Sequence, residues 1–291
     1  MRYNLFAILS ITCLLASCSA EGDKDMFDVA QTGFTLFEAD FEAVDMGGDN
    51  FEGVWDKDIA IGVFGSEAGE NVKYTLKNAY DGKAAGEFYG PVVKGDRIMA
   101  YYPYSEGYAL YEGGMTYALP STQGYVSENT LLEHFCANAG YAFAFNNSDN
   151  KLKFGYASGL FLIKIGFKNP IKVTAIELVS ENNNIAGIAK LNSDMSVAFG
   201  VGAVKTVCID FGQGIWSQEN GVLAQYPVVL AAGYYEDVKL VIKAEGYDDL
   251  ICKLDPFEIE RISVGDYKLT EVVVSINGLG GFEIEGGLDF E

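Results

Sequence analysis

Hydrophobic and polar residues alternate with a period of two along much of this chain. In residues 238–244, Val238, Leu240, Ile242 and Ala244 share one face, and both lysines fall on the other. Residues 160–167 repeat the pattern. Successive side chains of a β-strand point to opposite faces, so each run predicts a half-buried strand.

Comparable runs recur between clusters of Gly, Asn and Asp. They predict further strands near residues 33–43, 58–64, 71–76, 86–92, 96–102, 151–156, 171–179, 185–191, 204–211, 226–231 and 271–276. This number and spacing of short strands is typical of an all-β protein made of antiparallel β-sandwiches.

Only one segment has the spacing of an amphipathic helix. Residues 128–136 follow Ser127, a good N-cap residue, and carry Leu131, Leu132 and Phe135. The asparagine-rich clusters at 146–150 and 182–184 predict hairpin turns. A boundary near Ser158 gives two sandwich domains, 33–158 and 159–291, and the second ends in a tail rich in Gly and acidic residues.

The amino terminus has the features of a secretion signal. Residues 1–17 form a signal peptide whose apolar run is too short to span a bilayer. Residues 15–18, Leu-Ala-Ser-Cys, resemble the bacterial lipoprotein cleavage box, which implies lipidation of Cys18 and an outer-membrane location. The alternative is a signal cut elsewhere, with Cys18 incidental. Residues 18–32 form an acidic tether that resembles the export signal of surface-exposed lipoproteins.

Charge and histidine content exclude several functions. The chain has 291 residues, 41 of them acidic and 20 basic, for a formal net charge of −21. A protein this acidic repels polyanions, so nucleic acid is excluded as a partner. His134 is the only histidine, which rules out multi-histidine metal sites. We therefore expect no catalytic residues, no metal and no cofactor.

Other candidate chemistry is weak. The clusters at 45–50 and 146–150 lack the spacing of a calcium-binding loop. The aromatic groups at 101–104 and 234–235 either stack on sugars or close the core, and strand ends favour the core. Cys208 and Cys252 lie in apolar runs, as small core residues or as a bridged pair.

Several segments together resemble the fimbrillin family, the lipoprotein-derived pilus and adhesin subunits of Gram-negative gut and oral anaerobes. They are Trp55–Phe64, Gly95–Tyr104, Leu119–Gln123, Leu152–Phe154, Phe161–Phe167, Ile176–Leu178 and Ile185–Ala189. The resemblance implies two tandem transthyretin-like β-sandwich domains and a non-enzymatic role in surface fimbriae and adhesion. It also implies other fimbrial subunits as partners, joined by β-strand addition, and a host or bacterial surface ligand.

In that family a first strand is removed and a neighbouring subunit donates a replacement. Here the removable strand would carry Phe34, Leu36, Phe37 and Phe41, and the donor tail Phe282, Ile284, Leu288 and Phe290. An edge with unpaired N–H and C=O groups captures such an extended segment.

The chain departs from this scheme because it has no arginine between Cys18 and Arg97, although the family's first strand is cut off at arginine. The loop at 45–53 also lacks lysine. We therefore expect an anchor or accessory subunit that keeps its lipid. Two rivals remain: a carbohydrate-binding lipoprotein of a polysaccharide-uptake system, with Tyr102 on an exposed platform, and a glycosidase with two carboxylates across a cleft.

Overall fold

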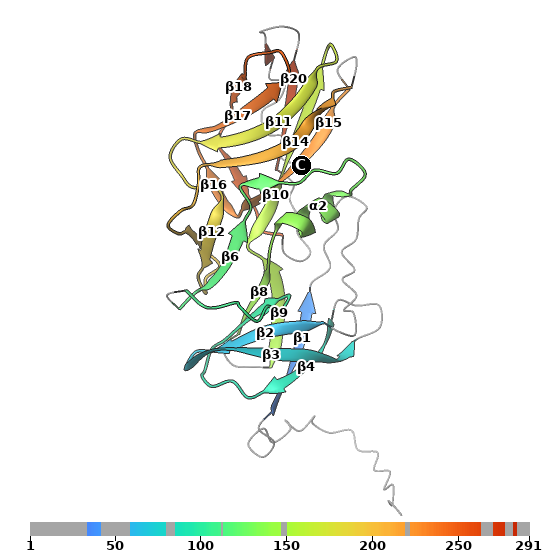
Figure 1. The fold of residues 1–291 in the computed structure, drawn as a ribbon. Coiled ribbons are helices and arrows are strands. Elements are labelled where there is room, and N and C mark those ends of the chain that lie inside the picture. The colour runs from blue at the N-terminus through green and yellow to red at the C-terminus, as the bar shows by residue number, and fades with distance from the viewer. Residues whose placement is uncertain are drawn as a thin grey trace, which may run out of the picture.

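The computed structural model describes residues 34–41, 59–79, 85–111, 113–146, 150–218, 222–262, 270–276 and 282–283. Apart from one short helix, the regular secondary structure of these residues is all β-strand, which confirms the all-β class. Figure 1 shows two bodies arranged end to end, with the first strands of the chain in the lower one.

Seven strands of the lower body close into a barrel. Their order is β1-β4-β3-β2-β5-β8-β9, and β1 also pairs with β9. The sequence predicted a sandwich here, which is wrong for this half, because period-two alternation fixes the inner face of each strand but not whether the sheet closes. The bounds are β1 (Phe34–Phe41), β2 (Ala60–Gly65), β3 (Ala68–Ala79), β4 (Ala85–Pro91), β5 (Ile98–Tyr102), β8 (Ala142–Asn146) and β9 (Lys151–Tyr156).

The upper body holds two sheets that share one apolar core. The first has the order β15-β10-β20-β21 and the second β18-β17-β11-β14-β7. Phe161 of β10, Ile176 of β11 and Leu240 of β17 are all buried in that core. The strands are β7 (Thr122–Gln123), β10 (Ser158–Phe167), β11 (Lys172–Ser180), β14 (Thr206–Trp216), β15 (Ala224–Ala231), β17 (Val238–Ala244), β18 (Leu250–Lys253), β20 (Thr270–Ile276) and β21 (Phe282–Glu283).

Three elements that precede residue 158 pair with or pack on strands that follow it. Strand β6 (Met115–Leu119) pairs with β12 (Gly187–Leu191), which also pairs with β13 (Val197–Phe199). Strand β7 pairs in parallel with β14, and the helix packs against β15. A small ladder joins β16 (Gly233–Tyr235) to β19 (Phe257–Ile259). The two bodies are therefore not two consecutive segments of the chain.

The helix, α2 (Leu131–Asn138), begins later than predicted. Its N-cap is Thr130 rather than Ser127, because Thr130 and Glu133 form a capping box. The Thr130 N–H donates to Glu133 Oε2 at 2.8 Å, and the Glu133 N–H donates to Thr130 Oγ1 at 3.3 Å. In the part of the chain that the structure describes, no helix has the length and apolar character needed to cross a membrane.

Candidate strand-exchange site

Strand β1 forms the seam of the barrel. It runs antiparallel to β4, from Phe34 opposite Pro91 to Asp40 opposite Ala85. Its second half runs parallel to β9, and the Glu38 N–H donates to the Asn150 carbonyl at 2.8 Å. Removal of this strand would therefore expose two strand edges at once, those of β4 and β9.

The two faces of β1 differ in burial. Thr35, Phe37 and Ala39 point into the barrel and are almost fully buried. On the other face, Phe34 is 42% exposed and Leu36 is half-buried. The alternation of a strand thus divides the predicted residues, and Phe37 is the buried aromatic among the first three of them.

An aromatic pocket receives Phe37. Its ring lies 5.3 Å from that of Tyr74, whose O–H donates to the Pro91 carbonyl. Burial raises the pKa of Tyr74 to about 12. Only glycine fits at position 90, because a Cβ on Gly90 would lie 2.7 Å from the Tyr74 ring. The space around Phe37, which the chain's own first strand fills, is therefore closely packed.

On the outer face of the barrel, the pairing of β1 with β9 places acidic residues opposite lysines. Glu38 lies opposite Lys151, and Asp40 lies opposite Lys153. Opposite charges at paired positions stabilise a sheet, so an acidic strand suits this seam. Sequence reasoning missed β9 as the partner, although its alternation of lysine with apolar residues complements the alternation of acidic and apolar residues in β1.

The other half of the predicted exchange is only partly described. Phe282 lies in β21, opposite Ile276 of β20, at the edge of the first upper sheet. Ile284, Leu288 and Phe290 lie outside the described residues, as does Cys18. The tail and the lipid site stay predictions.

Phe41 is the last residue of β1, and its backbone lies opposite Phe154 of β9. Because Phe154 is buried in the barrel core, this carboxyl end of β1 is held beside the core strand that follows it across the seam. Strand β1 is thus paired along its described length, with β4 over residues 34–40 and with β9 over residues 38–41.

The residues considered for other chemistry have structural roles where they are described. His134 is 5% exposed and its ring stacks on Tyr125 at 5.2 Å. Tyr101 is fully buried and Tyr102 half-buried, which matches the core interpretation of residues 101–104. Cys136, Cys208 and Cys252 are free thiols. Among the described residues, no three His, Cys, Asp or Glu side chains gather as a metal site would require.

The fold is similar to that of solved structures, although sequence comparison finds no match. No family model and no curated protein matches the sequence. The structure is similar to that of a candidate cell adhesion protein from Bacteroides ovatus, with a TM-score of 0.51 and 12% identity over 88% of this chain and 97% of that chain.

Two further structures are similar at lower scores. A candidate cell adhesion protein from Bacteroides uniformis has a TM-score of 0.48 and 17% identity over 89% and 99% of the two chains. The C-terminally truncated tip fimbrial protein Mfa3 from Porphyromonas gingivalis has 0.36 and 12% over 89% and 100%. The first similarity, above 0.5, confirms at the level of the fold the resemblance found in the sequence.

Proposed function

We propose that this protein is a non-enzymatic subunit of a surface adhesive assembly of the fimbrial type, in an anchor or accessory position. A lipid on Cys18 holds it in the outer membrane, exposed at the cell surface. It meets other subunits by β-strand addition, and each of its two bodies serves as one domain of the fimbrillin plan. The fold shared with a candidate cell adhesion protein supports this assignment.

The observation that carries the proposal is the position of β1. A strand bonded on both sides in the barrel seam is an integral element, and Phe37 fills the pocket that a donated strand would need. The first arginine after Cys18 is Arg97, whose carbonyl accepts from the Ser66 N–H at 3.0 Å within the barrel. Both features favour a subunit that keeps its own first strand.

Such a subunit can still donate a strand to a neighbour. Ile284, Gly286 and Leu288 repeat the apolar, small, apolar order of Phe37, Ala39 and Phe41, and Glu285 falls where Glu38 stands. A seam like that of β4 and β9 in another subunit would accept this tail by β-augmentation, since the backbone supplies the hydrogen bonds and alternate side chains fill the pockets.

Amino-terminal sequencing and mass measurement of protein taken from the cell surface test the proposal. We expect a chain that begins at lipidated Cys18 and retains residues 34–41. Surface protein that begins after residue 43 and forms long, SDS-resistant polymers would contradict it and would indicate a stalk subunit instead.

A further inference from the structure

A shallow pocket of about 350 Å³ opens on the upper body, away from the barrel seam. Asn183 and Asn184, from the connection between β11 and β12, line one side of it. Val197 and Phe199 of β13 and residues 231–235, which run from the end of β15 through β16, line the rest. None of the described residues that line the pocket is charged. Its volume is at the lower end of the range for small-molecule sites, about 300 to 1,000 Å³.

Tyr234 offers an exposed ring on a fixed backbone. It is 60% exposed, and its side chain makes no ring contact or hydrogen bond with another described residue, while its backbone pairs with Glu258 of β19. The next residue, Tyr235, is buried: its O–H donates to the Ala231 carbonyl at 2.8 Å, and its ring stacks on Phe257 at 5.2 Å. Because strand neighbours face opposite ways, the anchoring of Tyr235 directs Tyr234 outward.

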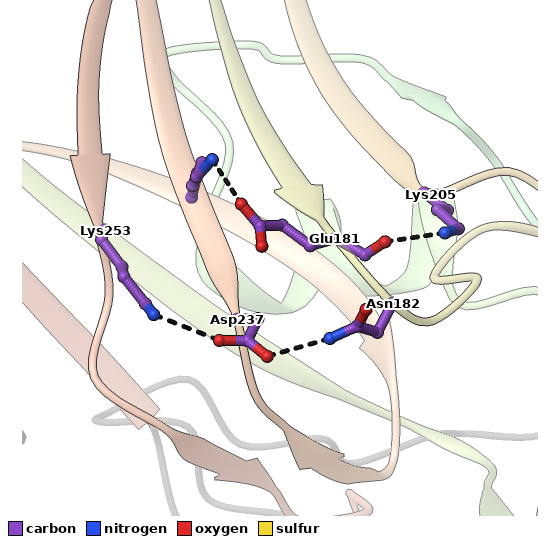
Figure 2. Close-up of polar contacts among 6 residues, drawn as sticks. Glu181, Asn182, Lys205, Asp237 and Lys253 are labelled. Atoms are coloured by element: carbon purple, nitrogen blue, oxygen red, sulfur yellow. Dashed lines mark hydrogen bonds and ion pairs between the residues drawn. The ribbon is translucent and has the colours of Figure 1, made fainter.

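Hydrogen bonds fix the asparagine loop, residues 182–184, from both sides. Figure 2 shows Asn182 Nδ2 donating to Asp237 Oδ2, at 2.9 Å. The Glu181 N–H donates to the Asp237 carbonyl at 3.1 Å, and the Asn183 N–H donates to Ser180 Oγ at 3.1 Å. The loop is therefore fixed by its backbone and by Asn182, which leaves the next two amides to face the pocket.

The charges beside the loop are paired with one another. Lys253 Nζ lies 3.1 Å from Asp237 Oδ1, and Lys205 Nζ donates to the Glu181 carbonyl at 2.7 Å (Figure 2). Lys239 forms an ion pair with the Glu181 carboxylate. By contrast, the side chains of Asn183 and Asn184 are exposed and form no hydrogen bond with any described residue. They are available to a ligand.

This combination of groups matches the chemistry of a neutral sugar. A pyranose ring has an apolar C–H face, which packs on an aromatic ring, and a rim of hydroxyls that donate and accept hydrogen bonds. A carboxamide also does both, so Asn183 and Asn184 can bind adjacent hydroxyls. The net charge of −21 opposes anionic ligands.

We propose that the Asn183, Asn184 and Tyr234 pocket binds an uncharged sugar residue of a surface glycan. The inference deepens the adhesive part of the proposed function by giving the class of ligand. It rests on that function only for the location of the pocket at the cell surface, since binding itself is a property of the folded chain.

The test is an array of neutral, sialylated and sulfated glycans probed with the mature chain, followed by calorimetry with the best neutral glycan. We expect neutral glycans to bind. Tyr234→Ala should weaken binding by about tenfold or more, because it removes the ring that the sugar packs on. Asn183→Ala and Asn184→Ala should each weaken it about threefold or more, through lost hydrogen bonds.

Tyr247→Ala is the matched control. Tyr247 is 44% exposed in the turn between β17 and β18, and it does not line the pocket. Its replacement should leave affinity unchanged, and Tyr234→Phe should retain most of it. The proposal is overturned if no neutral glycan binds, if only acidic glycans bind, or if Tyr234→Ala and Tyr247→Ala act alike. None of these results changes the amino-terminal sequence of the surface protein, so the proposed function is tested separately.

Discussion

Gln123 completes the edge of a sheet with a single side chain. Strand β15 is the edge strand of its sheet. The Gln123 amide donates to the Val229 carbonyl at 2.7 Å, and its oxygen accepts from the Val229 N–H at 2.8 Å. A carboxamide has the donor and acceptor of a peptide group, so this side chain stands where a neighbouring strand would. This contact gives a structural role to Gln123, one residue of the Leu119–Gln123 segment that carries part of the family resemblance.

We expect Gln123→Ala to lower the free energy of unfolding by about 2 kcal/mol, because it leaves a buried N–H and C=O unpaired. Gln123 is 1% exposed, so water does not replace the lost groups. Urea unfolding measures the change. Thr122→Ala, at the exposed neighbouring position, is the control and should change stability little. Equal losses in the two variants would refute the role given to the amide.

His134 makes stability depend on pH. Burial lowers its pKa from the ordinary 6.5, although the Glu133 carboxylate acts in the opposite direction. As the pH falls, the unfolded chain therefore binds a proton at this residue before the folded chain does. The contribution of His134 to stability is complete above pH 6.5 and decreases as the pH falls through that value.

His134→Phe should remove this dependence while keeping a ring against Tyr125. Unfolding free energies from about pH 8 to about pH 5 should fall more steeply for the wild type than for the variant. The difference between the two curves isolates His134 from the many carboxylates that titrate at lower pH. Parallel curves would contradict the prediction.

At the scale of elements, strands with complete alternation were predicted well and short ones were missed. Residues 238–244 form β17 with the predicted bounds, and 151–156 form β9. The short strands β13, β16 and β19 have three residues each and were not predicted. Their pairing depends on which segments the fold brings together, which local alternation does not encode.

The candidate site shows the same limit. The sequence predicted a first strand and its apolar residues, but alternation alone did not show that the face of Phe37 is inward and the face of Phe34 and Leu36 outward. Nor did it predict the parallel pairing of β1 with β9, because that contact joins residues more than a hundred positions apart. Sequence reasoning named Tyr234 as a candidate for stacking on sugars, but it did not predict the pocket, since the lining residues come from the loop after β11, from β13, from the end of β15 and from β16.

The two faces of β1 can be tested by a matched pair of phenylalanine variants. Phe37→Ala should destabilise the barrel by about 3 to 5 kcal/mol, since it empties the buried pocket beside Tyr74. Phe34→Ala should cost about 1 kcal/mol or less, because Phe34 is 42% exposed and only stacks on Tyr89. Thermal and urea unfolding compare them. A larger loss of stability for Phe34→Ala than for Phe37→Ala would contradict the assignment of Phe37 to the inner face of β1.

At the scale of the whole molecule, the chain crosses between its bodies more than once. Strands β6 and β7 and helix α2 lie in the sequence between barrel strands β5 and β8, yet they pair with or pack on strands that follow residue 158. A boundary drawn where one strand series ends and another begins does not detect such an excursion. The expected domains 33–158 and 159–291 therefore stay a prediction about folding units.

The excursion predicts how a fragment behaves. A fragment of residues 159–291 lacks β6, β7 and α2, so it exposes the edge of β12, the edge of β14 and the Val229 groups that Gln123 covers. Unpaired strand edges promote association. We expect this fragment to aggregate or to unfold without a cooperative transition, whereas the full chain unfolds cooperatively.

A peptide of residues 113–140 supplies the missing elements, and its addition should restore a soluble, cooperatively unfolding complex of one peptide and one fragment. The same peptide with Gln123→Ala should bind more weakly, because it cannot bond Val229. Sedimentation and urea unfolding distinguish the outcomes. If residues 159–291 alone are monomeric and as stable as the upper body of the full chain, the excursion is only a surface attachment, and consecutive domains describe the molecule after all.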